Sequence, residues 1–202
     1  MVTAADRRIH LVRHLPTAGT PPGWLDRDGL AAWFASEGLR GIVAGAEPSA
    51  ALVAAVAASD RVLVSPLARA RATADAALAR VAPAARPPVT VDPDLVEIPL
   101  PVLPVPRLRL PLDAWDAAAR VAWLAGYAGG VESRPEALAR GRRVAGRLAA
   151  LALDGAGTVA VVAHGFTNIL LARELRRLGW DGPRLPDHGN GAVTTYRSGM
   201  PT

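Results

Sequence analysis

The sequence predicts an α/β protein in which helices cover both faces of a mainly parallel sheet, a three-layer α/β/α sandwich. Short apolar runs alternate along the chain with longer segments whose apolar residues recur every three or four positions, as expected for strands that alternate with helices. One run, residues 158–163 (TVAVVA), is apolar almost throughout, which is typical of a strand buried on both faces. No repeat or linker divides the 202 residues, so we expect a single domain, 1–202.

The N-terminal third begins with a strand and continues with two helices. Residues 9–12 are apolar and are followed by a loop rich in glycine and proline, residues 16–23. Helical periodicity follows over residues 28–36 and 49–58, and in the second segment the large apolar side chains share one face.

The middle of the chain contains two short strands and an excursion without regular structure. Residues 62–64 predict a buried strand, and Pro66 is expected to open a helix because proline is favoured in a first helical turn. Residues 89–91 predict a third strand. The stretch 99–111 holds five prolines, which excludes a helix or a central strand and indicates an extended segment over the surface.

The C-terminal part alternates helix and strand again. A helix is expected over residues 113–124, and Ser133 with Glu136 matches a capping box that starts a long helix reaching about residue 153. The arginines of this helix are expected on a solvated face. The strand 158–163, a helix over 166–178 and a last strand over 192–196 complete the pattern.

The composition restricts the chemistry and the partners. The chain has no cysteine, which excludes a disulfide framework, a thiol nucleophile and a thiolate metal site. All 23 basic residues are arginine and the net charge is +5, which favours anionic ligands, but no basic motif with interleaved aromatic residues indicates a nucleic-acid partner. We expect a cytoplasmic protein without membrane association, because no targeting segment is evident and no run approaches the ~20 apolar residues of a membrane helix. Nothing in the sequence signals an oligomeric state.

Polar side chains follow four of the expected strands. They are Arg13 and His14 after the first strand, Ser65 and Arg69 after the second, Asp92, Asp94 and Glu97 after the third, and His164 with Gly165 after the fourth. Ligands of open α/β sheets bind beyond the carboxyl ends of the strands, so we expect these groups to converge there.

Such a group of side chains suits a phosphate ester. Arginine forks match phosphate oxygens, and helix N-termini add free N–H groups. An imidazole can attack phosphorus, and a carboxyl group can protonate the departing oxygen. No cofactor is implied, and no cluster of residues has metal-ligand spacing.

Four sequence blocks resemble those of the histidine phosphatase superfamily, which has the phosphoglycerate-mutase-like fold. They are LVRH (residues 11–14), SPLARARAT (65–73), LVEI (95–98) and VVAHG (161–165), in the order of that family. Glu132 and Ser133, with the arginine-rich helix behind them, resemble the segment that precedes its second histidine. The resemblance spans nearly the whole chain and implies a metal-independent phosphomonoesterase that acts on a small phosphorylated metabolite.

The resemblance also implies a covalent mechanism. His14 would attack phosphorus and become a phosphohistidine, while Glu97 would protonate the leaving group and then deprotonate the attacking water. The phosphoryl oxygens would be held by Arg13, Arg69 and His164, with Thr17 and Gly165 as further contacts. Asp92 and Asp94 stay open as alternative acids. Neighbouring arginines favour a neutral His14, whereas a bound dianion favours protonation of His164.

The chain departs from the family pattern next to the nucleophile. Leu15 stands where glycine normally follows the histidine, and Thr20 stands where asparagine is usual. These departures motivate an alternative, a non-catalytic or weakly active protein that binds phosphate or a phosphopeptide. A phosphoglycerate mutase is disfavoured, because the proline-rich segment 99–111 replaces the basic, tyrosine-containing segment of the mutases. Specificity is expected to lie in the loops around residues 17–28, in 99–111 and in the last loop.

Overall fold

A six-stranded sheet forms the centre of the protein. The computed structural model describes residues 7–20 and 22–198; the ends of the expected domain, 1–6 and 199–202, and residue 21 of the first loop lie outside this range. The strands have the order β4-β3-β6-β1-β8-β7. Their bounds are β1 Arg8–Arg13, β3 Arg61–Val64, β4 Val89–Val91, β6 Thr158–Ala163, β7 Trp180–Asp181 and β8 Val193–Ser198. The first four of these are parallel, while β8 is antiparallel to β1 and β7 to β8, which confirms the mainly parallel sheet.

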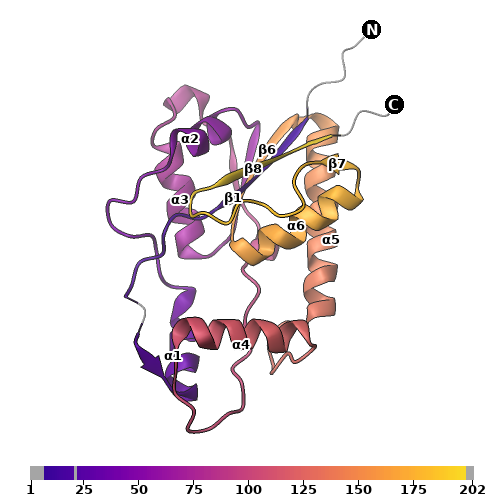
Figure 1. Cartoon of the computed structure of the whole chain (residues 1–202). Helices are drawn as coiled ribbons and strands as arrows, with labels where there is room; N and C mark the ends of the chain where they lie inside the picture. The colour runs from indigo at the N-terminus through magenta and orange to yellow at the C-terminus, as the bar shows by residue number, and fades with distance from the viewer. Residues whose placement is uncertain (1–6, 21, 199–202) are drawn as a thin grey trace.

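Helices cover both faces of this sheet (Figure 1), as the sequence predicts. One face packs against α5 (Arg134–Leu151) and α6 (Gly165–Arg177), and the other against α2 (Ala50–Ala57) and α3 (Ala68–Leu78). Side chains of β1 alternate between the two layers: Ile9 and Leu11 lie in the cluster with α5 and α6, and Val12 lies in the cluster with α2 and α3. The α/β/α sandwich is therefore confirmed.

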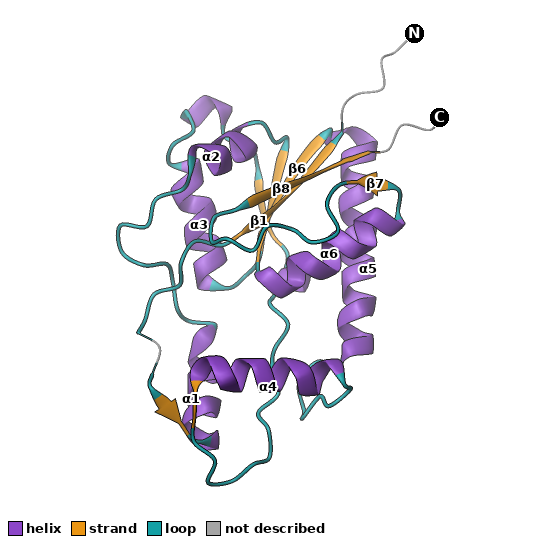
Figure 2. Cartoon of the chain, viewed as in Figure 1, coloured by secondary structure: helices purple, strands orange, loops and turns teal. Residues whose placement is uncertain are grey.

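Two helices lie apart from the sandwich and form a cap (Figure 2). They are α1 (Arg27–Glu37) and α4 (Leu112–Leu124), together with the two-stranded pair of β2 (Trp24–Leu25) and β5 (Leu110–Pro111). The indole of Trp115 in α4 donates to the carbonyl of Leu25 at 2.9 Å. The ring of Trp123 meets that of Phe166 edge-on at 5.3 Å, so α4 packs against the first turn of α6. The cap thus lies beyond the carboxyl ends of the parallel strands, where ligands bind in such sheets.

Several local predictions are confirmed and others are wrong. Residues 99–109 contain neither helix nor strand, and the capping box of Ser133 and Glu136 starts α5. The helix expected from Pro66 begins only at Ala68, because the chain turns after β3, where the Ser65 hydroxyl accepts from the Leu67 amide at 3.4 Å. Single turns of other helix types occur at Pro83–Ala85, Pro93–Leu95 and Ala152–Ala156. No helix of the described residues is long and apolar enough to cross a membrane.

Candidate active site

Strand ends bring two histidines and an arginine together. His14 follows β1, His164 follows β6, and Arg69 lies in the first turn of α3 behind β3. The imidazole centroids of His14 and His164 are 5.2 Å apart, and Nε of Arg69 donates to Nε2 of His14 at 3.2 Å. All three side chains are buried. The convergence expected from the sequence is therefore present for these three residues.

The hydrogen bonds of His14 define which nitrogen is available for chemistry. Nδ1 lies 2.7 Å from the carbonyl oxygen of Leu15, which can only accept, so Nδ1 carries the proton. Nε2 then carries the lone pair of the ring, which accepts the N–H of Arg69. The backbone amide of His14 donates to the carbonyl of Ala163 of β6 at 3.0 Å, which fixes the residue at the carboxyl end of β1. An imidazole held in this tautomer presents Nε2 as a nucleophile.

Burial keeps both imidazoles neutral at pH 7. The pKa of His14 is lowered from 6.5 to about 4, first by burial and then by the charges of Arg69 and Arg13, while the Leu15 carbonyl opposes this shift. The pKa of His164 is lowered to about 2, first by burial and then, in decreasing order, by the charges of Arg69, His14, Arg13 and Arg140. The neutral His14 expected from its arginine neighbours is thus supported, but burial is the larger cause.

Arg69 is held in place by residues that the sequence did not single out. Its Nη1 donates to the carbonyl of Glu37 at 2.8 Å, and Nη2 lies 3.7 Å from Oε1 of the same residue. Its own carbonyl accepts from the hydroxyl of Thr73 at 2.7 Å, and that hydroxyl accepts from the Leu15 amide at 2.9 Å. Burial lowers the pKa of Arg69, and the carboxylates of Glu37 and Glu97 oppose this effect. These contacts fix the position of the charged guanidinium of Arg69 beside His14.

Two polar atoms at the site are buried without a partner among the described residues. They are Nε of Arg13 and Nδ1 of His164. The other ring nitrogen of His164 lies 2.8 Å from the hydroxyl of Ser65, and Nη1 of Arg13 donates to the carbonyl of His188. Gly165 packs beside Arg13, with Nε 3.5 Å from the position a Cβ would take. An unpaired buried polar group costs about 1–3 kcal/mol, which an oxygen atom of a bound anion would recover.

The carboxylate of Glu97 sits at the N-terminus of α6, immediately after His164. Its Oε1 accepts from the amides of Ile98 and Thr167, both at 3.0 Å, and lies 3.2 Å from the hydroxyl oxygen of Thr167. Its Oε2 accepts from the amide of Phe166 at 3.3 Å. These donors orient the carboxylate, and the free amides and positive dipole end of the helix favour a negative group there. Glu97 thus lies at the turn of α6 that follows His164, and it influences Arg69 electrostatically.

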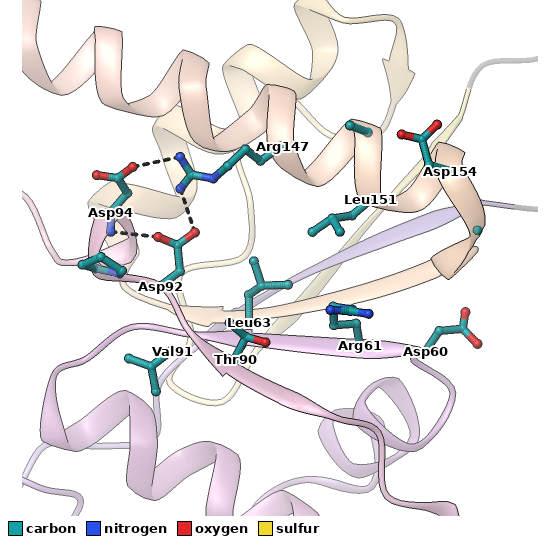
Figure 3. Close-up of a pocket in the computed structure, with 13 residues that line it drawn as sticks. Asp60, Arg61, Leu63, Thr90, Val91, Asp92, Asp94, Arg147, Leu151 and Asp154 are labelled. Atoms are coloured by element: carbon teal, nitrogen blue, oxygen red, sulfur yellow. Dashed lines mark hydrogen bonds and ion pairs between the residues drawn. The ribbon is translucent and has the colours of Figure 1, made fainter.

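The alternative acids Asp92 and Asp94 face a different part of the molecule. Both carboxylates bind the guanidinium of Arg147 of α5, at 2.7 Å and 2.9 Å. Figure 3 shows this group at one end of a pocket of ≈ 1050 Å³ between α5 and the β3–β4 edge, whose lining includes neither His14 nor His164. These contacts favour Glu97 as the carboxyl group of the site.

Thr17 and Leu15 occupy positions that bear on the departures from the family pattern. Thr17 pairs through its backbone with Ile42, and its side chain has no hydrogen bond to the histidines or arginines of the site among the described residues. The Leu15 side chain is buried against the turn at Gly191, so it packs into the core. In the described residues, no group of three or more histidine, aspartate or glutamate side chains is placed to hold a metal.

The sequence matches the model of a known protein family. A model of the histidine phosphatase superfamily (branch 1) matches residues 43–199, a range that includes Arg69, Glu97 and His164 but begins after His14. No curated protein matches the sequence.

Solved structures share the fold at low sequence identity. A candidate α-ribazole-5'-P phosphatase of Escherichia coli has 21% identity and a TM-score of 0.57, over 94% of this chain and 89% of the other. The mycobacterial glucosyl-3-phosphoglycerate phosphatase, in complex with VO3, has 24% identity and a TM-score of 0.54, over 94% and 90%. The protein histidine phosphatase SixA, in complex with tungstate, has 17% identity and a TM-score of 0.51, over 93% and 86%. At these identities the likeness shows a common fold.

Proposed function

Because this chain belongs to the histidine phosphatase superfamily, we propose that it hydrolyses phosphate monoesters through a phosphohistidine formed on His14. The observation that carries this proposal is the state of His14: a buried imidazole, neutral at pH 7, whose Nε2 lone pair faces the guanidinium of Arg69. A phosphoryl group that displaces this hydrogen bond would meet a nucleophile and a fixed positive charge at once. Phosphoryl transfer depends mainly on such positioning and charge stabilisation.

In the first step Nε2 of His14 attacks phosphorus and the bond from phosphorus to the ester oxygen breaks. Arg69 and Arg13 neutralise the phosphoryl oxygens, and His164 provides a further polar contact. The bound phosphate dianion favours the protonated form of Glu97, which transfers its proton to the departing oxygen, so the leaving group is released as an alcohol. The imidazole becomes a phosphohistidine whose Nδ1–H still donates to the carbonyl of Leu15, which stabilises the positive ring.

In the second step water attacks phosphorus and the bond from nitrogen to phosphorus breaks. Glu97, now a carboxylate, takes a proton from the water, and His14 returns to its neutral form. Atoms and protons balance over the cycle, with one ester and one water giving one alcohol and one phosphate. Guanidinium groups carry the charge neutralisation, so the proposal requires no divalent cation.

The proposed substrate is a small phosphorylated metabolite. The cap and the segment 99–111, which leads into it, lie beyond the strand ends and would contact the leaving group. Two of the similar structures are named for small phosphorylated substrates, which supports this class over a phosphoprotein.

Hydrolysis of p-nitrophenyl phosphate in excess EDTA tests the proposal. We expect turnover by the wild type and by Arg71→Met, whose side chain is exposed on α3, and losses of ~10²-fold or more in His14→Ala and Arg69→Met. Equal activity of wild type and His14→Ala would overturn the proposal. Phosphate binding by an inactive wild type would instead favour the binding-protein alternative.

A further inference from the structure

The segment that carries Glu97 has no regular structure of its own. Residues 96–100 are neither helix nor strand, and Val96 alone separates Glu97 from the single turn Pro93–Leu95. A carboxylate that must meet a leaving oxygen within a few tenths of an ångström needs its backbone fixed by other means. Contacts from outside the segment therefore decide where the carboxylate lies.

Arg140 of α5 supplies the main polar contacts of that kind. The sequence suggested a solvated arginine face for this helix, but Arg140 is 7% exposed. Its Nη1 donates to the carbonyls of Asp94 at 2.6 Å and of Val96 at 3.0 Å, so one nitrogen binds the backbone on the N-terminal side of Glu97. The correction has a physical reason: position 140 lies on the apolar stripe of α5, with Ala137 and Val144 one turn away on either side.

Glu132 fixes the other end of this guanidinium. Its two carboxylate oxygens accept from Nε at 2.8 Å and from Nη2 at 2.6 Å, a bidentate pair that sets the plane of the fork. The carbonyl of Glu132 in turn accepts from the indole of Trp123 at 2.8 Å, which ties the pair to the cap helix α4. A lysine could not reproduce this geometry, because it lacks the planar fork.

Thr167 completes the arrangement from the side of α6. Its hydroxyl donates to the carbonyl of Val96 at 2.7 Å and lies 3.2 Å from Oε1 of Glu97, while its amide donates to the same Oε1. The carbonyl of Val96 is thus bound by both Arg140 and Thr167. The backbone before Glu97 and its carboxylate are held by the same two elements, α5 and α6.

We propose that Arg140, oriented by Glu132, is a positioning residue that acts with Thr167 to hold Glu97 as the proton donor of the reaction. This inference rests on the proposed function, in which Glu97 is the acid. Arg140 touches no reacting atom; it acts through the carbonyls of residues 94 and 96. If Glu132 and Arg140 only stabilised the fold, replacing them would lower the activity on all substrates equally. If they position Glu97, replacing them lowers the activity most on substrates whose leaving group needs the proton.

Two esters of nearly the same shape separate these roles. Phenyl phosphate releases a basic phenolate that needs protonation, and p-nitrophenyl phosphate releases a stabilised anion that does not. We expect Glu97→Gln to lower kcat/KM for phenyl phosphate by ~10²-fold and for p-nitrophenyl phosphate by much less. The double variant Glu132→Gln/Arg140→Met, which leaves no buried charge unpaired, should shift the ratio of the two in the same direction by ~10-fold. Thr167→Val should also shift the ratio of the two kcat/KM values in this direction, although this variant keeps the Glu132–Arg140 pair.

Amide hydrogen exchange tests, independently of catalysis, whether Arg140 and Thr167 hold Glu97 in place. The amides of Ile98 and Thr167 donate to Glu97, so they report directly on the position of its carboxylate. Their exchange should accelerate by ~10-fold in the double variant and stay within ~2-fold of wild type in Arg143→Met, a more exposed arginine on the same helix.

Unchanged exchange in the double variant would show that Arg140 does not hold Glu97 in place. Faster exchange with equal losses on both esters would overturn its role in positioning the acid. If the wild type hydrolyses neither ester, the proposed function fails, and the positioning role fails with it; the exchange result then decides only whether the contact holds the segment.

Discussion

The buried imidazoles of the site predict that the protein loses stability in mild acid. The pKa of His14 is lowered from 6.5 to about 4 and that of His164 to about 2, in both cases mainly by burial. In the unfolded chain both imidazoles take up protons as the pH falls below 6.5, whereas in the folded protein they do not until lower pH. The unfolded state therefore binds more protons between pH 7 and pH 5, and the free energy of unfolding falls as the pH falls.

The magnitude follows from the lowered pKa values. At pH 5 the pH is about 1.5 units below the pKa that each imidazole has in the unfolded chain, while both imidazoles are still neutral in the folded protein. Each imidazole therefore lowers the free energy of unfolding by about 2 kcal/mol between pH 7 and pH 5. This figure is the same for a folded pKa of about 4 or about 2, since both lie below pH 5.

Urea denaturation at pH 7 and at pH 5 measures the effect. In His14→Gln and in His164→Gln the loss of unfolding free energy between the two pH values should be smaller than in the wild type by about 2 kcal/mol. A variant that loses as much as the wild type would show that the replaced imidazole is protonated in the folded protein. The buried, neutral site described above would then be wrong.

Three further predictions concern the anion site and the packing around it. Tungstate at 100 times its Kd should raise the free energy of unfolding by about 2.7 kcal/mol in wild type and in Arg71→Met but not in Arg69→Met; equal stabilisation of all three proteins would place the anion elsewhere. Replacing the buried Leu15 by alanine should cost about 3 kcal/mol in urea and leave kcat for p-nitrophenyl phosphate within a few-fold, while faster turnover would mean that this leucine obstructs the site. Gly182→Ala should cost about 2 kcal/mol, because its Cβ would lie 2.4 Å from Cδ1 of the buried Tyr196; unchanged stability would contradict that packing.

The parts of the fold that the sequence predicts are those fixed by local pattern. The strands β1, β3, β4, β6 and β8 and the six helices follow apolar periodicity and caps, and the observed bounds differ from the expected ones by a few residues at most. The strands β2, β5 and β7 have two residues each. So short a strand carries no period, and its partner across the sheet decides its conformation.

The candidate site shows the same division. His14, Arg69 and His164 could be predicted because each comes shortly after the carboxyl end of a strand, and the carboxyl ends of parallel strands lie at the same side of the sheet. Glu37 and Arg140 could not, since their roles depend on long-range contacts with Arg69 and with the carbonyls before Glu97. The position of Arg140 on the buried stripe of α5 was the one local signal for its burial. Thr17 remains a prediction, and its hydroxyl makes no hydrogen bond to the histidines or arginines of the site among the described residues.

The central claim, that His14 is the nucleophile, is tested most directly by trapping the phosphorylated enzyme. Glu97→Gln should accumulate it from p-nitrophenyl phosphate, because this leaving group departs without the acid whereas the water of the second step needs the base. Quenching in alkali, where phosphohistidine survives, followed by peptide mass spectrometry should find phosphate on His14 and none when His14→Ala is added. Phosphate on His164 instead, or sustained hydrolysis by the wild type with no phosphate on His14 in either protein, would contradict the account.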